Sequence, residues 1–548
     1  MKYYENEEVN LSFYSTPLSS IVPGPLLANE LGMFLPKPFV IFFAGLAIVI
    51  MLSAAFNYTS LSIARSLTRA KEYGIRKSFG ASKGQLIFQI VTEAVVLSLV
   101  SLFFVDMLLQ LIVPAFSGMK LMSLLKIDPH QNTITYLSYF IFALITGLLA
   151  GIIPAYYVSS LNPVKVLKAS SNIRLIKRVT FRKILLVTQY TFSIIFIISI
   201  LLIYRQMNYM LKSDLGFDRN VIYNISLNGQ DFSKVKDQFS QFPEVTSVSA
   251  ATHIPGIGNY TSIYLKTKPE DESYEGAYFS VDPNYLITMG IKIIAGEDFP
   301  KDPDVNSNLV VINRKAVEYF QFNSPPDAVG KDILIYDTLP VRIIGVVDDY
   351  KYVALFMPIK PLILRMNPEQ YNIAVLRLNT TDREATLSKF KEAWKTINPN
   401  HDIDASFLEY EIKDFYSLFE DIQYTVGFTT ILAIVIACLG LFGMASYSIQ
   451  TRLREIGVRK VFGSQSGRVA LLIGRTFIIL LAIAALIAAP LAYLLNSAWI
   501  KFLAFHVTFG VGNILTGVLI VFLIGILTIL SQTLKAADSN PVDILKYE

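Results

Sequence analysis

Seven stretches of the chain are long and apolar enough to cross a lipid bilayer as helices. A helix that crosses the roughly 30 Å hydrocarbon core needs about 20 mostly apolar residues, and each stretch has almost no charge inside it. One such stretch would also suit a buried helix of a large soluble protein, but seven indicate a membrane protein. The predicted spans are residues 38–61, 86–114, 134–157, 184–204, 424–448, 470–496 and 510–533.

A long polar segment, residues 206–423, separates the fourth and fifth predicted spans. It mixes strand-like runs of alternating or continuous apolar residues with helical runs, which is typical of an α+β domain. The strand-like runs are 309–312, 341–347 and 373–378, and a helical run is 387–397.

Composition fits this alternation of membrane and polar segments. Hydrophobic residues make up 53% of the 548 positions, and charged residues make up 17%, against about 25% in a typical soluble domain. The single cysteine, Cys438, lies inside an apolar run. One cysteine excludes both an internal disulfide framework and a CxxC metal site.

Lysine and arginine set the predicted orientation. They concentrate in segments 62–85, 158–183 and 449–469, which hold few acids. These segments fall on one side of the membrane if the spans alternate, and that side is the cytoplasm by the positive-inside rule. We therefore expect a cytoplasmic C-terminus, with residues 1–36, 115–133, 205–423 and 497–509 on the other side. The predicted fold is a polytopic α-helical membrane protein with an α+β extracytoplasmic domain.

The chain repeats itself. RAKEYGIRKSFGASKGQL at 69–86 matches RLREIGVRKVFGSQSGRV at 452–469 without a gap, and LNPVKVLK at 161–168 matches SNPVDILK at 539–546. Each copy holds three predicted spans and ends in an Asn-Pro tail, Asn162-Pro163 or Asn540-Pro541. Two copies in the same direction predict a pseudo-twofold axis along the membrane normal. The residues shared by the two loops are Glu72, Gly74, Arg76, Lys77, Phe79, Gly80 and Gly84, and Glu455, Gly457, Arg459, Lys460, Phe462, Gly463 and Gly467.

This repeat suggests five segments. They are residues 1–36, the remnant of a first outer domain; 37–168, the first three-helix repeat; 169–205, a linker with the helix leading the second half; 206–423, the outer domain; and 424–548, the second repeat. Residues 1–36 would lie outside although no span or signal peptide precedes them. Either the topology is wrong or one helix and most of an outer domain would precede residue 1, and we favour the second alternative.

The repeated loop predicts a short basic helix beside the membrane. Glu72 and Arg76 are four residues apart with the acid first, the favourable order for a helical ion pair, as are Glu455 and Arg459. Gly80 and Gly463 suit the residue that ends such a helix. Anchoring to lipid head groups would explain the cations, but not the repeated glycines. A cytoplasmic partner that docks on both loops explains both. In the third predicted span, a Gly-xxx-Gly pair at 147 and 151 predicts close helix packing.

Taken together, these features resemble permease subunits of the MacB/FtsX type from ATP-binding cassette (ABC) systems, in the double-length form of Bacteroidetes-type bacteria. The resemblance covers essentially the whole chain. Besides the ExGxRK loops and the NPVxxLK tails, four stretches carry it: AAFNYTSLSIARSLTRAKEYGIRK at 54–77, VTQYTFSIIF at 187–196, DPNYLITMGIKIIAGEDF at 282–299 and APLAYLLNSAWIKFLAFH at 489–506. Ser464-Gln465 departs from the usual Ala-Ser, so the two loops need not bind a partner equally.

The resemblance implies a subunit of a bacterial inner-membrane exporter or extractor. A cytoplasmic ABC ATPase dimer would contact the two loops and the Asn-Pro tails. The loop residues are Glu72, Gly74, Arg76, Lys77 and Gly80, and their counterparts Glu455, Gly457, Arg459, Lys460 and Gly463. ATP binding by the ATPase would move the outer domain, a mechanism called mechanotransmission. ATP and Mg²⁺ would bind in that ATPase, and no cofactor or metal in this chain. Other partners would be the lipid bilayer and a periplasmic adaptor or outer-membrane channel, and no nucleic acid is expected.

Two other functions stay open from the sequence. The same mechanics could regulate a periplasmic cell-wall hydrolase, as in FtsX-like proteins, or the chain could be a non-transporting signalling receptor or scaffold. An enzyme is not expected, because the chain contains no GxxxxGK[ST] nucleotide-binding loop and no HExxH or GxSxG motif.

Overall fold

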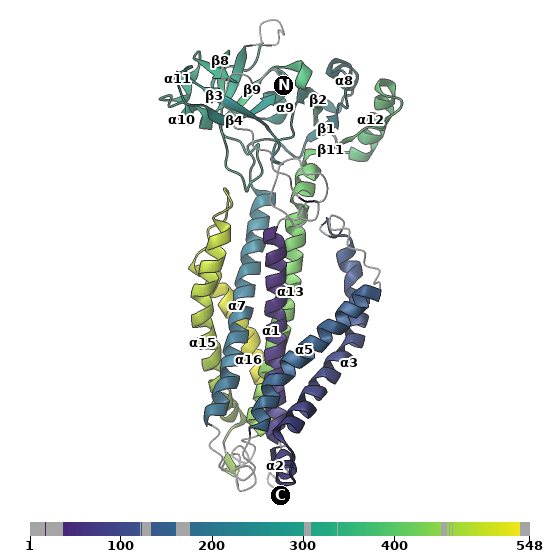
Figure 1. Ribbon diagram of the computed structural model, residues 1–548. Helices are drawn as coiled ribbons and strands as arrows, with labels where there is room; N and C mark the ends of the chain where they lie inside the picture. Colours follow the sequence, from purple (N-terminus) through teal and green to yellow (C-terminus); the bar gives the residue numbers. More distant parts are fainter. Residues whose placement is uncertain are drawn as a thin grey trace. The chain divides into compact units, whose positions relative to one another are not determined.

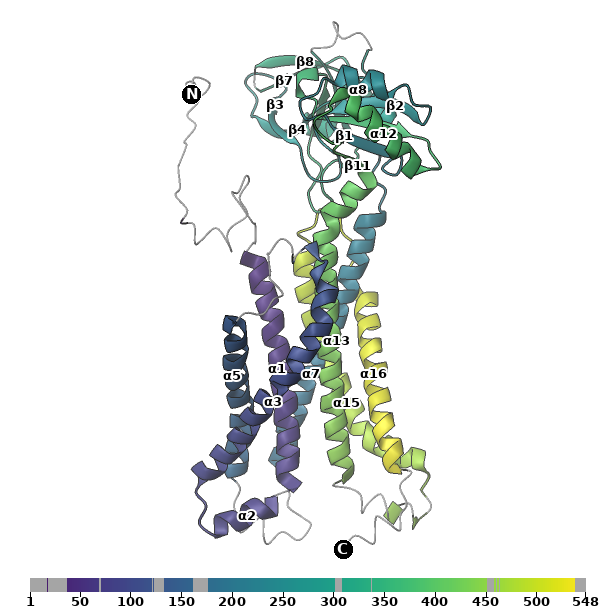
Figure 2. The ribbon, with the colours of Figure 1, turned by 90° about the vertical axis from the view of Figure 1, so that its right-hand side faces the viewer.

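A computed structural model describes residue 17 and residues 37–68, 70–120, 122, 133–160, 176–300, 308–336, 338–450, 458–459, 461–462 and 464–537. The chain forms two compact units, which we describe separately (Figures 1 and 2). The membrane unit comprises Met1–Ile203, Asp421–Asn496 and Phe509–Glu548. The outer unit comprises Tyr204–Glu420 and Ser497–Thr508. The five-segment division of the sequence stays a prediction.

Seven helices among the described residues are long and apolar enough to cross a membrane, which confirms the predicted number. They are α1 (Lys37–Thr68), α3 (Lys83–Ser117), α5 (Thr133–Ser159), α7 (Ile176–Lys212), α13 (Leu408–Gln450), α15 (Ser466–Ile500) and α16 (Val511–Ala537). The short helix α2 (Ala70–Ser78) lies between α1 and α3.

Helix α13 is longer than its predicted span because hydropathy detects only the apolar part of a helix. The helix begins at Leu408, about four turns before the predicted start near residue 424. Leu408, Ile412 and Tyr416, which recur every four residues and so share one face, are buried in the core of the outer unit. This first part of α13 therefore folds with the outer unit rather than with the membrane unit.

Helices α3 and α5 pack closely at small residues. A Cβ atom placed on Gly147 would lie 2.8 Å from Val95 Cα, and one placed on Gly151 would lie 2.8 Å from Ala94 Cβ. No larger side chain fits at either position unless the helices separate. The predicted Gly-xxx-Gly packing is thus confirmed.

Side-chain hydrogen bonds join α7 to its neighbours in the second half of the membrane unit. The Tyr190 hydroxyl donates to the Ala437 carbonyl of α13 at 3.4 Å. At the other end of the bundle, Asn496 Nδ2 of α15 donates to Ser199 Oγ at 3.0 Å. Such bonds and close packing hold membrane helices together, since lipid tails are as apolar as the helices themselves.

Four antiparallel strands form the first sheet of the outer unit. In spatial order they are β11 (Ala405–Phe407), β1 (Ile222–Ser226), β10 (Ile373–Leu378) and β2 (Val245–Ala251). Helices α8 (Phe232–Phe239) and α12 (Arg383–Ile397) pack on one face of this sheet (Figure 1). Phe390 and Trp394 of α12 are fully buried there.

The second sheet closes on itself, because β7 pairs with β8 as well as with β3. Its strands, in spatial order, are β5 (Ile293–Gly296), β8 (Leu339–Val347), β6 (Leu309–Asn313), β9 (Leu362–Arg365), β4 (Tyr274–Ser280), β3 (Thr261–Lys266) and β7 (Asp332–Ile335). Helices α10 (Arg314–Tyr319) and α11 (Pro325–Ala328) contact this sheet, helix α9 (Tyr285–Met289) contacts β2 and β10 of the first sheet, and a 3₁₀ turn spans Pro368–Gln370. The predicted strands at 309–312, 341–347 and 373–378 and the predicted helix at 387–397 are confirmed.

The loop between α15 and α16 belongs to the outer unit. Phe505 N–H donates to the Leu355 carbonyl at 3.1 Å. Gln206 holds the same loop from both sides, since its Nε2 donates to the Phe505 carbonyl at 3.0 Å and its Oε1 accepts from Val507 N–H at 2.9 Å. The loop is therefore fixed by backbone and side-chain bonds within the outer unit.

Asp282 is a buried carboxylate directly after β4, with a residue exposure of 5%. Its Oδ1 accepts a bond from Asn284 N–H at 2.9 Å, and its Oδ2 lies 3.4 Å from Lys236 Nζ. Burial raises the pKa of this carboxyl above its usual range, although the Asn284 N–H and the Lys236 ammonium act in the opposite direction.

Replacing Gly147 should separate α3 from α5. We expect Gly147→Val to lower the free energy of unfolding by about 1–3 kcal/mol, because the new side chain meets backbone that cannot yield. Thermal unfolding of the detergent-purified chain would measure this. Gly45→Val in α1 is the control, since a Cβ there meets nothing within 4 Å. Equal losses in both variants would contradict the close-packing explanation.

Asp282→Asn should change how stability depends on pH. Because the folded pKa is raised, the folded state binds more protons than the unfolded state at pH values between 3.8 and that pKa, so the wild type loses stability there as pH rises. The variant lacks this titration. We expect its unfolding free energy to increase relative to wild type as the pH rises above 3.8. Exposed Asp237→Asn serves as the control, and a pH-independent difference for Asp282→Asn would refute the assignment.

Candidate functional site

Helix α2 contains the first copy of the repeated motif and ends in a glycine-dependent turn. Glu72 Oε1 and Arg76 Nη2 are 2.7 Å apart, which confirms the predicted i, i+4 ion pair. Gly80 has φ +91°, in the left-handed region that glycine adopts without strain. Gly80 N–H donates to the Lys77 carbonyl at 3.1 Å, and Ala81 N–H donates to the Arg76 carbonyl at 3.0 Å. These two bonds define a Schellman motif, so Gly80 ends the helix as predicted.

The charged residues of the motif fasten α2 to the membrane helices. Arg76 Nη1 donates to Gln89 Oε1 of α3 at 2.7 Å. Lys77 Nζ donates to the carbonyl of Ser159, the last residue of α5, at 2.5 Å. This bond satisfies an unpaired carbonyl at the negative end of α5. Partial burial, together with the nearby Lys83, lowers the pKa of Lys77. The two cations therefore fix the orientation of α2.

Apolar side chains, by contrast, project from the turn. Phe79 is 88% exposed and Ile75 on the preceding turn is 47% exposed. On the opposite side of α2, Tyr73 is buried against Leu86, Ile90 and Ala155. The turn therefore presents two apolar side chains, Phe79 and Ile75, on an otherwise polar helix.

The second copy forms the same turn where it is described. Phe462 N–H donates to the Val458 carbonyl at 3.1 Å, as Phe79 N–H does to its counterpart four residues earlier at 3.0 Å. Ser464 N–H donates to the Arg459 carbonyl at 3.0 Å, which repeats the bond that closes the first turn. Phe462 is 85% exposed and Val458 is 42% exposed. Both copies thus present one exposed phenylalanine and one aliphatic side chain.

The remaining predicted site residues lie outside the described residues. They are Glu455, Gly457, Lys460 and Gly463 of the second loop, and Asn162, Pro163, Asn540 and Pro541 of the tails. The predicted ATPase contacts of both loops stay predictions.

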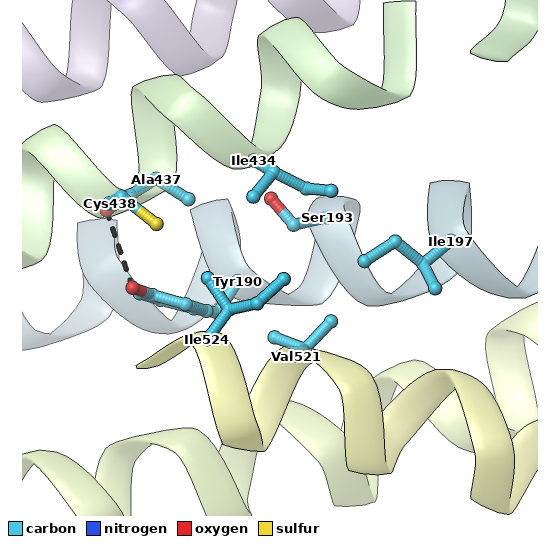
Figure 3. Close-up of a pocket in the computed structure, with 8 residues that line it drawn as sticks. All are labelled: Tyr190, Ser193, Ile197, Ile434, Ala437, Cys438, Val521 and Ile524. Carbon is cyan, nitrogen blue, oxygen red and sulfur yellow. Dashed lines mark hydrogen bonds between the residues drawn. The ribbon is translucent and has the colours of Figure 1, made fainter. Parts of the chain in front are cut away.

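A small cavity lies between α7, α13 and α16 inside the membrane unit (Figure 3). Its volume of about 10 Å³ is at the lower limit for one water molecule. Figure 3 shows Tyr190, Cys438 and Val521 around it, with the Tyr190 hydroxyl bonded to Ala437 at one end. This cavity is too small for a transported molecule. In the described ranges, no group of three or more His, Cys, Asp or Glu side chains could hold a metal ion.

Reasoning from the sequence selected the charged residues of the motif and missed the exposed apolar pair. Phe79 and Phe462 match in the two loops, as do Ile75 and Val458. An apolar residue repeated on an otherwise polar helix was the available signal. Composition alone does not tell whether such a side chain packs inward, as Tyr73 does, or outward.

Comparison with known protein families decides the class. Residues 41–163 and 427–541 match the FtsX-like permease C-terminal family, so both copies of the repeat are recognised. Residues 190–393 match the MacB-like periplasmic core domain. The chain belongs to the MacB/FtsX-like ABC transporter permeases. As a member of this family it is a membrane protein with a periplasmic domain, and the outer unit contains that domain.

Individual relatives of this permease are distant. The uncharacterized ABC transporter permease YknZ of Bacillus subtilis is 25% identical over 53% of this chain and 74% of its own length. The macrolide export ATP-binding/permease protein MacB of Campylobacter jejuni is 23% identical over 55% of this chain, which spans 47% of that protein. The periplasmic region of MacB from Actinobacillus actinomycetemcomitans aligns over 37% of this chain and 96% of its own, with 15% identity and a TM-score of 0.29.

Lys77→Met should release α2 of this permease from α5. The variant loses the bond to the Ser159 carbonyl, so local opening of α2 becomes easier by about 1 kcal/mol. We expect about 5- to 10-fold faster hydrogen exchange at the amides of α2, measured by mass spectrometry. Lys83→Met is the control, since Lys83 is exposed at the start of α3. Unchanged exchange in Lys77→Met would show that the bond does not hold α2.

Proposed function

We propose that this permease couples ATP hydrolysis by a separate cytoplasmic ATPase to movement of its periplasmic domain, for export or extraction of a substrate. The chain itself would act as a mechanical transmitter and not as an enzyme. It would lie in a bacterial inner membrane with its C-terminus in the cytoplasm. ATP and Mg²⁺ would bind in the partner ATPase.

One observation carries this proposal: the chain has two equivalent rigid turns, each with an exposed phenylalanine. The same hydrogen bond closes both turns, from Ala81 to Arg76 and from Ser464 to Arg459. Two similar surfaces on one chain suit a partner that has two similar surfaces, such as an ATPase dimer. Burial of one phenylalanine contributes about 1.5–3 kcal/mol, so the two side chains would add substantially to the binding energy of a larger interface.

The helices offer a path from the turns to the periplasmic domain. The cations of α2 join it to α3 and α5, so a force on Phe79 acts on these helices and not on a loose loop. Helices α7 and α13 each contribute residues to both the membrane unit and the outer unit. Since an uninterrupted helix transmits axial displacement, movement of the membrane helices would reach the outer unit. A periplasmic adaptor or outer-membrane channel would then act on the substrate side.

The test is to make the two phenylalanines charged. We expect Phe79→Asp together with Phe462→Asp to weaken binding of the ATPase by at least about 10-fold, because a carboxylate does not enter an apolar pocket. Co-purification from membranes and stimulation of ATPase activity by the permease would measure the loss. Single variants should each show a partial effect.

Phe502→Asp is the matched control, since Phe502 is also 85% exposed but belongs to the outer unit. Arg76→Glu with Arg459→Glu should reduce ATPase stimulation while the protein still inserts, because the substitution disorients the turns. If no ATPase co-purifies with the wild type, or if every loop variant stimulates it normally, the proposed function is wrong.

A further inference from the structure

Three helices of the membrane unit bring polar side chains together around one glycine. A Cβ atom placed on Gly440 of α13 would lie 2.9 Å from Gln189 Oε1 and 3.4 Å from Gln189 Nε2 of α7. It would also lie 3.3 Å from Asn57 Oδ1 of α1. The two amide side chains therefore occupy the same small space, which exists only because residue 440 has no side chain.

The amide nitrogen of Gln189 does not donate a hydrogen bond to Asn57. Gln189 is 2% exposed, and its Nε2 has no hydrogen-bond partner among the described residues. Asn57 Oδ1 faces the same space and is an acceptor. An unsatisfied donor is costly in a membrane interior, where water cannot replace the missing partner. A donor without a bond and an acceptor therefore face the same small space.

Helix α1 presents a polar face at this place. Ser53, Asn57 and Ser60 follow the i, i+4, i+7 spacing of one helix face. Ser53 and Ser60 are 2% and 5% exposed, and neither hydroxyl has a hydrogen-bond partner in the described part of the chain. Thr59, on the opposite face, donates to Ala150 of α5. One face of α1 is thus hydrogen-bonded to α5 of the same repeat, and the opposite face carries hydroxyl groups without hydrogen-bond partners among the described residues.

The residues of this contact are counterparts in the sequence repeat, as expected beside the predicted pseudo-twofold axis. Continuing the register of the matched loops backwards along the sequence pairs Asn57 with Gly440 and Ser60 with Gly443. Asn57 is therefore in contact with its own counterpart, as residues beside a twofold axis are. Asn57, Gln189 and Gly440 each lie about two helical turns from one end of their candidate membrane span. For Asn57, this is the end of α1 that leads to α2.

We propose that Asn57 and Gln189 form a latch between the two halves of the membrane unit. In a second arrangement of the two halves, Gln189 Nε2 donates to Asn57 Oδ1, whereas in the arrangement described here that bond is open. Gly440 provides the space in which the two amides meet. The latch is inferred from these contacts alone and does not rest on the proposed function.

The latch can be tested by measuring how the two halves move. Leu111 and Leu494 are equivalent positions in the two repeats and are 69% and 63% exposed, so both accept spin labels. Replacing the single cysteine, Cys438→Ser, gives a cysteine-free background for Leu111→Cys with Leu494→Cys. Electron spin–spin distance measurements on the purified full chain should then give two distance populations.

Removing either amide side chain should change the ratio of the two distance populations. We expect Asn57→Leu and Gln189→Leu each to reduce the latched population by about 3- to 20-fold, the range for one hydrogen bond between membrane helices. The double variant should lose no more than either single variant, since both remove the same bond. The exchanged pair, Asn57→Gln with Gln189→Asn, should restore the wild-type ratio.

Glycine variants give an independent check that needs no polar substitution. Gly440→Ala should act like Asn57→Leu, because its Cβ would displace the Gln189 amide. Gly427→Ala, in the same helix, should leave the ratio unchanged, since the nearest atom to its Cβ is 3.7 Å away. A single population in the wild type, or a ratio that none of the variants changes, overturns the latch.

Measuring the same population ratio after addition of the co-purified ATPase and ATP distinguishes failure of the latch from failure of the proposed function. If the latch variants change the ratio but ATPase and ATP do not, the latch stands and the coupling to ATP fails. If ATPase and ATP change the ratio equally in the wild type and in all latch variants, the coupling stands and the latch is wrong.

Discussion

Lipid cannot form hydrogen bonds, and this constraint governs the whole membrane unit. Every backbone amide in the hydrocarbon must be satisfied within its own segment, so the chain crosses as uninterrupted helices. Without a hydrophobic driving force between them, these helices associate through small residues and side-chain bonds. Gly147 against Val95 and Tyr190 bonded to Ala437 are examples of each. The Gln189 amide nitrogen and the Ser53 and Ser60 hydroxyls depart from this pattern, because each is buried without a hydrogen-bond partner in the described part of the chain.

The sequence predicts the parts of this fold that depend on local composition. Length and apolarity locate seven helices, since bilayer thickness alone sets that requirement. Strand-like runs in the outer domain are located for a similar reason, because their apolar patterning is local. The start of α13 is missed because Leu408, Ile412 and Tyr416 are buried by other segments of the outer unit, which hydropathy does not include. The end of α2 is predicted because only glycine adopts the conformation of Gly80 without strain.

At the candidate site, the sequence predicts helix α2 but not the direction of its side chains. Arg76 and Lys77 are predicted to contact a partner, which stays a prediction, and the structure adds that both bond to neighbouring helices. Their direction depends on Gln89 and on the end of α5, which are distant in sequence. Asn57 and Gln189 illustrate the same limit, since nothing along the chain indicates that they share the space over Gly440. When the alignment of the two repeats is extended from the loops into the helices, it shows only that Asn57 corresponds to Gly440, not that the two residues are in contact.

The repeated halves are similar in backbone and unequal in side chains, and the difference has a physical consequence. Gln89, which accepts a bond from Arg76, corresponds to Leu472, and an aliphatic side chain cannot accept one. Ser78 corresponds to Val461, which is 65% exposed. The Arg76–Gln89 bond of the first turn thus cannot form at Leu472, and the second turn exposes one more apolar side chain, Val461. A partner with two identical surfaces would therefore meet two turns of different side-chain chemistry. An axis that relates the backbones does not equalise the two docking energies.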